Sequence, residues 1–333
     1  MSLGFAVIGA GRIGQLHARH LAWSVGGAHL ACVMDADPEA ARRAAYAGAD
    51  ALDDFEAALA HPRVDAVVIA SPTGFHAEQI GAAARAGKSV FCEKPVALTV
   101  KETVAALRAV EEAGVPFQIG FNRRFDPGYA EVARAVKAGE IGKVELFRSQ
   151  SSDPPPVATE YLATSAGYYR DSVIHDIDTA RFVVGEIERV TTLGRVLVDP
   201  AFAEYDDVDT SVVTLEFATG ALGVLLNSRR TVHGYDLRVE VHGERGKLVT
   251  EDERATKVWR YDAKGIHGDY YYYFLERFKD AYRIELQGFV DAVLAEQTPM
   301  PGAVAAIESL RVAEAAILSL KEGRPVDVAE IRG

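Results

Sequence analysis

Short apolar runs alternate with helical stretches over the first 120 residues. The apolar runs predict strands at Gly4–Ile8, Leu30–Met34, Ala66–Ala70, Ser89–Cys92 and Pro116–Ile119. A period of 3.6 between them predicts helices at Ile13–Ala22, Pro38–Ala47, Phe55–Ala60, His76–Ala86 and Val100–Ala113. This alternation is typical of a parallel sheet wrapped by crossover helices. We therefore predict a doubly wound α/β domain over residues 1–120.

The pattern changes after Gly120, because long alternating runs dominate from Lys143 to Trp259. They predict strands at Thr210–Phe217, Leu222–Asn227, Asp236–His242 and Lys247–Thr250. Helices are expected at Gly128–Ala138, Asp171–Val184, Phe274–Ala295 and Ala303–Lys321. Residues 121–333 are therefore predicted to form an α+β domain with a large, mainly antiparallel sheet. A proline-rich stretch at 151–159 is expected to be a loop near the cleft.

Composition and charge exclude several classes of protein. A chain of 333 residues is enough for two domains. Acidic residues outnumber basic ones by 48 to 36, and the formal charge of -12 argues against binding to nucleic acid or to an anionic membrane surface. No apolar run approaches the roughly 20 residues of a membrane span. Cys32 and Cys92 lie in apolar strand-like runs, which favours reduced thiols, and no basic segment precedes the first strand, so we expect a cytoplasmic protein.

A glycine-rich turn follows the first predicted strand. Gly9-Ala10-Gly11-Arg12-Ile13-Gly14 stands between a strand and a helix, the context in which a G-x-G-x-x-G pattern predicts a Rossmann dinucleotide site. The helix N-terminus there offers free N–H groups to a pyrophosphate. Asp35 closes the second strand, where a carboxylate accepts hydrogen bonds from ribose hydroxyls and repels a 2′-phosphate. The sequence therefore predicts NAD in preference to NADP, with an N-cap role as the alternative for Asp35.

Two further groups of polar residues are candidates for chemistry. Ser71-Pro72-Thr73 and Glu93-Lys94-Pro95 follow predicted strands, at the edge where open α/β sheets bind ligands. Asp171 and His175 stand four residues apart, so a regular helix would present both on one face. A carboxylate beside an imidazole is typical of a general acid/base. From these residues alone a surface lysine and an incidental aspartate and histidine remain the alternative, and a metal site is poorly supported.

In order along the chain, these motifs resemble those of the glucose-fructose oxidoreductase, inositol dehydrogenase and MocA family. The resemblance covers nearly the whole length and is strongest to its inositol 2-dehydrogenases. It is based on the glycine-rich turn, Glu93-Lys94-Pro95, Gly120-Phe121-Asn122-Arg123-Arg124-Phe125-Asp126 and Arg170-Asp171-Ser172-Val173-Ile174-His175-Asp176.

The resemblance implies roles for individual residues. Lys94, Asp171 and His175 are implied to contact the substrate near the nicotinamide, together with Tyr235 and Asn122. The inositol enzymes vary at the position of Asn122, and the loop 153–166 also differs among relatives, so the choice of substrate follows less directly than the fold. The residues that we assign to the cofactor are Gly9, Gly11, Arg12, Ile13, Gly14, Asp35, Ser71, Thr73, His76, Glu93, Lys94 and Arg123.

These residue types suit hydride transfer from a secondary alcohol. The hydroxyl proton must leave with the hydride, and His175 is the expected base because histidine has an ordinary pKa of about 6.5. Asp171 would stabilise the imidazolium, and Lys94 would stabilise the developing alkoxide or relay the proton. We predict an NAD-dependent oxidoreductase that converts myo-inositol to 2-keto-myo-inositol. The alternatives are scyllo-inositol, another sugar or a dihydrodiol as substrate, or a non-catalytic NAD-binding sensor.

The resemblance also implies a homotetramer assembled through the antiparallel sheet. Apolar residues alternate on both faces of Val212-Val213-Thr214-Leu215 and Gly223-Val224-Leu225-Leu226, which agrees with a covered sheet. The aromatic run Tyr270–Tyr273 is expected in packing or in a subunit interface.

Overall fold

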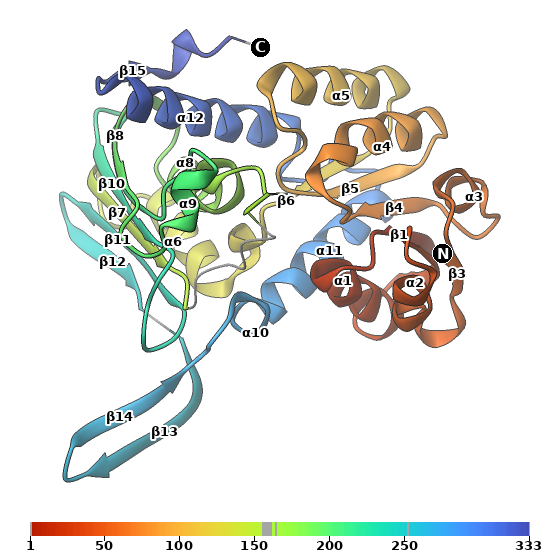
Figure 1. Cartoon of the computed structure of the whole chain (residues 1–333), viewed down its shortest axis with the longest axis horizontal. Helices are drawn as coiled ribbons and strands as arrows, with labels where there is room; N and C mark the ends of the chain where they lie inside the picture. The colour runs from red at the N-terminus through yellow and green to blue at the C-terminus, as the bar shows by residue number, and fades with distance from the viewer. Residues whose placement is uncertain (1, 155–161, 164, 252, 333) are drawn as a thin grey trace. The chain divides into compact units, whose positions relative to one another are not determined.

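The computed structural model describes residues 2–154, 162–163, 165–251 and 253–332, and the chain divides into two compact units (Figure 1). Unit 1 comprises Met1–Phe125, Asp280–Leu310 and Arg332–Gly333. Unit 2 comprises Asp126–Lys279 and Arg311–Ile331. Each unit is built around its own sheet.

The sheet of unit 1 has six strands in the order β3-β2-β1-β4-β5-β6, and all of its strand pairs are parallel. Its strands are β1 (Leu3–Ile8), β2 (Ala28–Met34), β3 (Asp50–Leu52), β4 (Ala66–Ile69), β5 (Ser89–Glu93) and β6 (Phe117–Gly120). The direction of winding reverses between β1 and β4, which is the point where such sheets bind ligands. The predicted Rossmann fold is confirmed, although the three-residue edge strand β3 was not predicted.

Local signals account for most helix bounds in unit 1. Its helices are α1 (Arg12–Trp23), α2 (Pro38–Ala44), α3 (Phe55–Ala60), α4 (Thr73–Arg85), α5 (Val100–Ala113) and α11 (Lys279–Leu294). Asp54 and Thr99 cap the amides that begin α3 and α5, and both helices have their predicted bounds. The prediction for Pro38–Ala47 was too long, because the chain leaves α2 at Ala44 and Ala47 adopts a φ of +55° in a 3₁₀ turn.

After the long segment Asp126–Lys279 of unit 2, helix α11 returns the chain to unit 1. Phe289 packs edge-on against Phe5 and Phe91, with ring centroids 6.1 and 5.9 Å away. Its neighbours Leu286 and Val290 are fully buried in the same cluster, with side chains from α1 and α2. The compact units therefore differ from the contiguous division at residue 120, because a helix from the C-terminal third completes the core beside β1.

The sheet of unit 2 has seven strands in the order β12-β11-β7-β10-β9-β8-β15. They are β7 (Val144–Ser152), β8 (Ile187–Arg195), β9 (Thr210–Phe217), β10 (Leu222–Ser228), β11 (Asp236–Gly243), β12 (Gly246–Thr250) and β15 (Val326–Asp327). Only the pair formed by β7 and β10 is parallel. The predicted, mainly antiparallel sheet is confirmed.

Helices α6 (Pro127–Lys137), α8 (Ile174–Val183), α9 (Ala201–Glu204), α10 (Phe274–Arg277) and the C-terminal part of α12 (Ala303–Glu322) belong to unit 2. The prediction of one regular helix over Asp171–Val184 was wrong in its first turn, because η3 (Tyr169–Val173) is a π-helical turn before α8. The predicted helix Phe274–Ala295 is likewise divided, at Phe278, into α10 and α11.

A hairpin of β13 (Arg254–Asp262) and β14 (Gly265–Tyr270) projects from the large sheet of unit 2 (Figure 1). The loop predicted at 151–159 was wrong at its start, because Ser151 and Ser152 pair with neighbouring strands as the end of β7, and positions 155–159 lie outside the described residues. Of the variable loop 153–166, positions 155–161 and 164 lie outside the described residues. Cys32 and Cys92 are buried and free. In the described part of the chain, no helix combines the length and the apolar character that a membrane crossing requires.

Candidate active site

The glycine-rich turn connects β1 to α1, and each glycine has its own physical reason. Gly9 has a φ of +94°, which residues with a Cβ rarely adopt. A Cβ at Gly14 would lie 1.8 Å from the carbonyl oxygen of Gly9, so only glycine lets the helix pack on the turn. A Cβ at Gly11 would meet nothing within 4 Å, which leaves open space over the start of α1.

That open space fits a pyrophosphate. No side chain caps the first amides of α1, and its first turn contains no acidic residue. Arg12 is exposed at the first helical position, and Ile13 is half-buried behind it. A helix N-terminus with free N–H groups and no competing carboxylate favours an anion. The turn therefore passes a structural test for the diphosphate of NAD.

Asp35 follows β2 and faces the turn. Its Oδ2 accepts a hydrogen bond from the Ala10 amide at 2.6 Å, and its Oδ1 accepts one from the Asp37 amide at 2.9 Å. Asp37, not Asp35, caps α2 by accepting from the Glu39 amide at 2.9 Å. The alternative N-cap role for Asp35 is thus excluded. A 2′-phosphate beside this carboxylate would be repelled, as the preference for NAD requires.

His76, in α4, joins the two loops that follow β4 and β5. Its Nε2 lies 2.8 Å from the carbonyl oxygen of Ser71, and its Nδ1 lies 2.8 Å from that of Pro95. Burial lowers the pKa of His76, and the two carbonyl oxygens partly offset that effect. Since His76 is 1% exposed, the structure gives it a positioning role for these loops.

The loops themselves place several predicted cofactor residues at the carboxyl edge of the sheet. Ser71 and Thr73 are half-buried around the start of α4, where Ser71 Oγ donates to Gln79 at 2.6 Å. Lys94 is half-buried directly after β5. The other predicted residues of this edge, Asn122 and Arg123, are 2% and 3% exposed in the turn after β6.

In unit 2, Asp171 and His175 belong to one continuous helical segment, but to different parts of it. Asp171 lies in the π-helical turn η3, whereas His175 lies in the first turn of α8. The regular 3.6-residue spacing assumed from the sequence therefore does not hold between them. Single π-helical turns inserted before or within helices often occur at functional sites.

Asp176 fixes the start of α8 to the sheet. Its Oδ1 accepts hydrogen bonds from Ser149 and Ser151 of β7 at 2.6 and 2.9 Å, and its Oδ2 accepts one from Asn227 of β10 at 2.9 Å. A fully buried carboxylate with three donors of this kind is a structural anchor. The neighbouring His175 is thus carried by a segment that is tied to two strands.

Arg229, at the end of β10, is the residue that the sequence analysis missed. Its guanidinium donates to Asp153 at 2.9 Å and to Asp171 at 3.3 Å, and it lies 4.7 Å from the centroid of the Tyr168 ring. Burial by itself lowers the pKa of Arg229, but the two carboxylates raise it above its ordinary value. A permanent cation therefore holds the carboxylate of Asp171. The signal in the sequence was an arginine pair, Arg229-Arg230, at the end of an apolar strand.

Tyr235 is half-buried just before β11. Its amide donates to the carbonyl oxygen of Tyr271 at 3.0 Å, and its ring packs edge-on against Phe278 at 6.3 Å. A separate cavity of about 410 Å³ in unit 2 is lined by charged residues of β7, β11 and β12 and contains no predicted site residue.

Two family models match the chain. One, described as an oxidoreductase family with an NAD-binding Rossmann fold, matches residues 3–121, and a GFO/IDH/MocA C-terminal domain matches residues 129–249. The chain belongs to the Gfo/Idh/MocA family. It is therefore an NAD-dependent oxidoreductase that acts on CH–OH groups. The predicted family, cofactor and enzyme class are confirmed.

Relatives match over nearly the full length. A myo-inositol 2-dehydrogenase of Thermotoga maritima is 39% identical, with 98% of this chain and 99% of the relative covered. An NAD-dependent scyllo-inositol 2-dehydrogenase of Bacillus subtilis is 39% identical, with 97% and 95% covered. A solved scyllo-inositol dehydrogenase of Lactobacillus casei, with NAD(H) and scyllo-inositol bound, is 29% identical with a TM-score of 0.93, and 99% and 100% of the two chains are covered.

Proposed function

We propose that this enzyme oxidises one secondary hydroxyl of an inositol, with myo-inositol as the substrate and 2-keto-myo-inositol as the product. The observation that carries this proposal is the match of inositol dehydrogenases to almost every residue of the chain. The glycine-rich turn and Asp35 support binding of NAD by the first 120 residues. We assign the substrate to the residues that follow, which include Asn122 and Tyr235.

In this proposal Lys94, Asp171 and His175 act together on the substrate. When bound, NAD supplies the acceptor for the hydride. An imidazole nitrogen of His175 takes the hydroxyl proton, and the carboxylate of Asp171 stabilises the imidazolium that forms. The ammonium of Lys94 stabilises the negative charge that develops on the substrate oxygen. The guanidinium of Arg229 pairs with the carboxylate of Asp171, which favours its ionised form and fixes its orientation.

The test is formation of NADH from NAD with a panel of myo-inositol, scyllo-inositol, glucose and a dihydrodiol. We expect the highest kcat/KM with myo-inositol. Absence of NADH with every inositol, beside activity with another alcohol, would refute the proposed substrate class. A panel without any turnover would instead favour the non-catalytic sensor.

scyllo-Inositol is the second candidate, because two of the relatives named above act on it. myo-Inositol and scyllo-inositol differ in configuration at a single carbon, and oxidation there gives the same ketone. Reduction of 2-keto-myo-inositol with NADH therefore separates the two candidates by product. We expect myo-inositol, and scyllo-inositol as the main product would overturn the choice.

We also propose a homotetramer in the cytoplasm. On the large sheet of unit 2, Leu193 pairs with Val212 and Val212 with Leu226, which forms an apolar stripe across three strands. Leu193 is 65% exposed and Val212 is 37% exposed. A stripe of this kind favours contact with a second subunit. Sedimentation equilibrium would test the oligomeric state, and a mass of one subunit would contradict it.

A further inference from the structure

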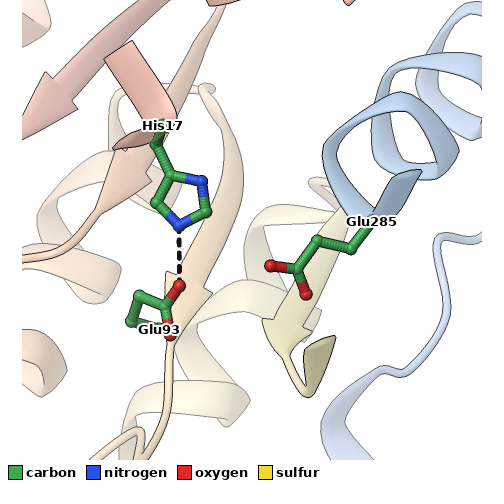
Figure 2. A group of neighbouring side chains, drawn as sticks. All are labelled: His17, Glu93 and Glu285. Carbon is green, nitrogen blue, oxygen red and sulfur yellow. Dashed lines mark hydrogen bonds and ion pairs between the residues drawn. The ribbon is translucent and has the colours of Figure 1, made fainter. Parts of the chain in front are cut away.

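Three ionisable side chains meet in unit 1 beside the end of β5 (Figure 2). His17 comes from α1, Glu93 from β5 and Glu285 from α11. The Nε2 of His17 and the Oε1 of Glu93 are 2.6 Å apart, and the carboxyl group of Glu285 points toward both (Figure 2). One nitrogen or oxygen atom from each residue lies within 4.8 Å of the other two.

This cluster is almost completely removed from water. His17 and Glu285 are 0% exposed, and the Glu93 side chain is 12% exposed. The rings of Phe91 and Tyr282 pack edge-on against His17, with centroids 5.4 and 5.8 Å away. Within the described residues, neither carboxylate oxygen of Glu285 has a hydrogen-bond partner. An ionised and unpartnered carboxylate would be strongly unfavourable in these surroundings.

A proton on Glu285 removes this difficulty. Burial, and secondly the charge of Glu93, raise the pKa of Glu285 well above its ordinary value. Two ionised carboxylates offer each other no donor, whereas a protonated Glu285 has an O–H that can donate to Glu93. A carboxylate only accepts, so the Nε2 of His17 bears the hydrogen in its contact with Glu93.

We propose that His17, Glu93 and Glu285 form a buried proton-sharing triad that positions Glu93, and through it the adjacent Lys94. In this triad the Nε2–H of His17 and the carboxylic O–H of Glu285 both donate to the carboxylate of Glu93. His17 and Glu285 are therefore positioning residues. The triad stands on its own geometry, and only its effect on Lys94 rests on the proposed function.

Two other titratable groups beside the triad, His20 and Cys92, are neutral near pH 7. His20, one turn further along α1, has a pKa lowered to about 4 by burial and then by His17, Arg283 and Arg19, partly offset by Asp280, so it is neutral near pH 7. Burial raises the pKa of the Cys92 thiol, which is neutral as well. From β6, the Nε2 of Gln118 donates to the main-chain oxygen of Glu285 at 3.2 Å. Glu93 is the charge that acts on Glu285.

A divalent metal ion is the rival occupant, and the distances argue against it. Two ligands at about 2.0–2.2 Å from a tetrahedral zinc ion lie about 3.4 Å apart. The 2.6 Å between His17 and Glu93 is a hydrogen-bond distance and is too short for that arrangement.

The first test compares the unfolding equilibrium of wild type and Glu285→Gln across pH. The folded-state pKa of Glu285 is raised, so its proton stabilises the fold fully below the unfolded value of 4.5, and this contribution is lost as pH rises through the folded value. Above 4.5, the unfolding constant of wild type should therefore rise about tenfold per pH unit relative to Glu285→Gln until the folded value is reached.

Glu112→Gln is the matched control, since it makes the same chemical change at an exposed position of α5 and should not change that slope. A ratio of wild type to Glu285→Gln that is independent of pH would overturn the triad. Infrared spectroscopy of the wild type tests the same point without any variant. The carbonyl stretch of a protonated carboxylic acid should be present at pH 7, and its absence would also overturn the proposal.

The second test separates positioning from mere packing. Glu285→Leu keeps a buried side chain of similar size but removes the donor to Glu93, whereas Glu285→Gln keeps a donor. We expect Glu285→Leu to remain folded and to lose about tenfold or more in kcat, and Glu285→Gln to restore most of that kcat.

Wild-type turnover in Glu285→Leu would overturn the role for Lys94. A wild type that is inactive on all inositols would refute the proposed substrate. The pH dependence of the unfolding constant would still test the triad in that case. The purified protein should contain no stoichiometric metal. A tightly bound divalent ion that is lost in Glu285→Gln would replace the triad by a metal site.

Discussion

Replacing Asp35 by alanine, together with Ala36→Arg, should move the cofactor preference toward NADP. The carboxylate of Asp35 has two tasks in our proposal: it would accept hydrogen bonds from the ribose hydroxyls of NAD, and in the structure it accepts one from the amide of Ala10 at 2.6 Å. Loss of a charge-assisted bond to a ribose hydroxyl removes about 1.5–3 kcal/mol, which corresponds to about 10- to 160-fold in kcat/KM for NAD.

The second task adds a cost in stability. Ala10 is 2% exposed, and its amide would lose its acceptor, which costs about 1–3 kcal/mol of unfolding free energy. Asp35→Asn is the matched control, since its amide oxygen still accepts from Ala10 while the negative charge is gone. We expect Asp35→Asn to relax the discrimination against NADP with a smaller loss of stability than the alanine variant.

The assay is kcat/KM for NAD and for NADP with one saturating polyol, accompanied by denaturant unfolding of each variant. If the ratio of the two kcat/KM values is the same in wild type and in both variants, the role of Asp35 is refuted. If the ratio of the two kcat/KM values shifts but the free energy of unfolding of the alanine variant does not, the hydrogen bond from the Ala10 amide contributes less to stability than its length suggests.

The remaining predictions concern the turn and the catalytic residues. His175→Ala and Lys94→Ala should each lose at least about 10²-fold in kcat while still binding NAD, and wild-type turnover in either variant would remove that residue from the mechanism. Gly14→Ala should destabilise the fold, because its Cβ would lie 1.8 Å from a carbonyl oxygen, whereas Gly11→Ala should keep its stability and bind NAD more weakly, as calorimetry would show. Arg229→Met should lower the free energy of unfolding by about 3 kcal/mol and reduce kcat, because the carboxylates of Asp153 and Asp171 lose their cation. Arg229→Lys should recover part of both losses. An unchanged kcat in Arg229→Met would contradict the proposed positioning of Asp171.

Features that depend on neighbours in sequence were predicted well. Helix α5 begins at the Thr99 cap and ends before Gly114, which has a φ of +65°, and both signals are local. The short strand β3 was missed because it exists through pairing with β2, where Met34 lies opposite Leu52. The π-helical turn at Asp171 was missed for a similar reason, since a 3.6 pattern does not reveal one additional residue in a turn.

The residues of the candidate site divide in the same way into those set by local sequence and those set by contacts between distant segments. Gly9, Gly11 and Gly14 follow from local geometry. By contrast, Arg229 contacts Asp171 across 58 residues of sequence, and His17 contacts Glu93 across 76. No periodicity relates such pairs. The sequence signals were the arginine pair Arg229-Arg230 for the first contact and a histidine on the apolar face of the first helix for the second.

The place of α11 in unit 1 has a consequence for synthesis of the protein. Gln287 binds the main chain of Gly26 across 261 residues, and Phe289 completes the core beneath Phe5. The ribosome adds about 5–20 residues per second, so the stretch between Phe125 and Asp280 takes about 8 to 30 s to emerge. During that interval the nascent NAD-binding part exposes the apolar face that α11 later covers. Molecular chaperones therefore have a defined target on this chain, and a gene fragment that stops at residue 125 would encode a protein that keeps that face exposed.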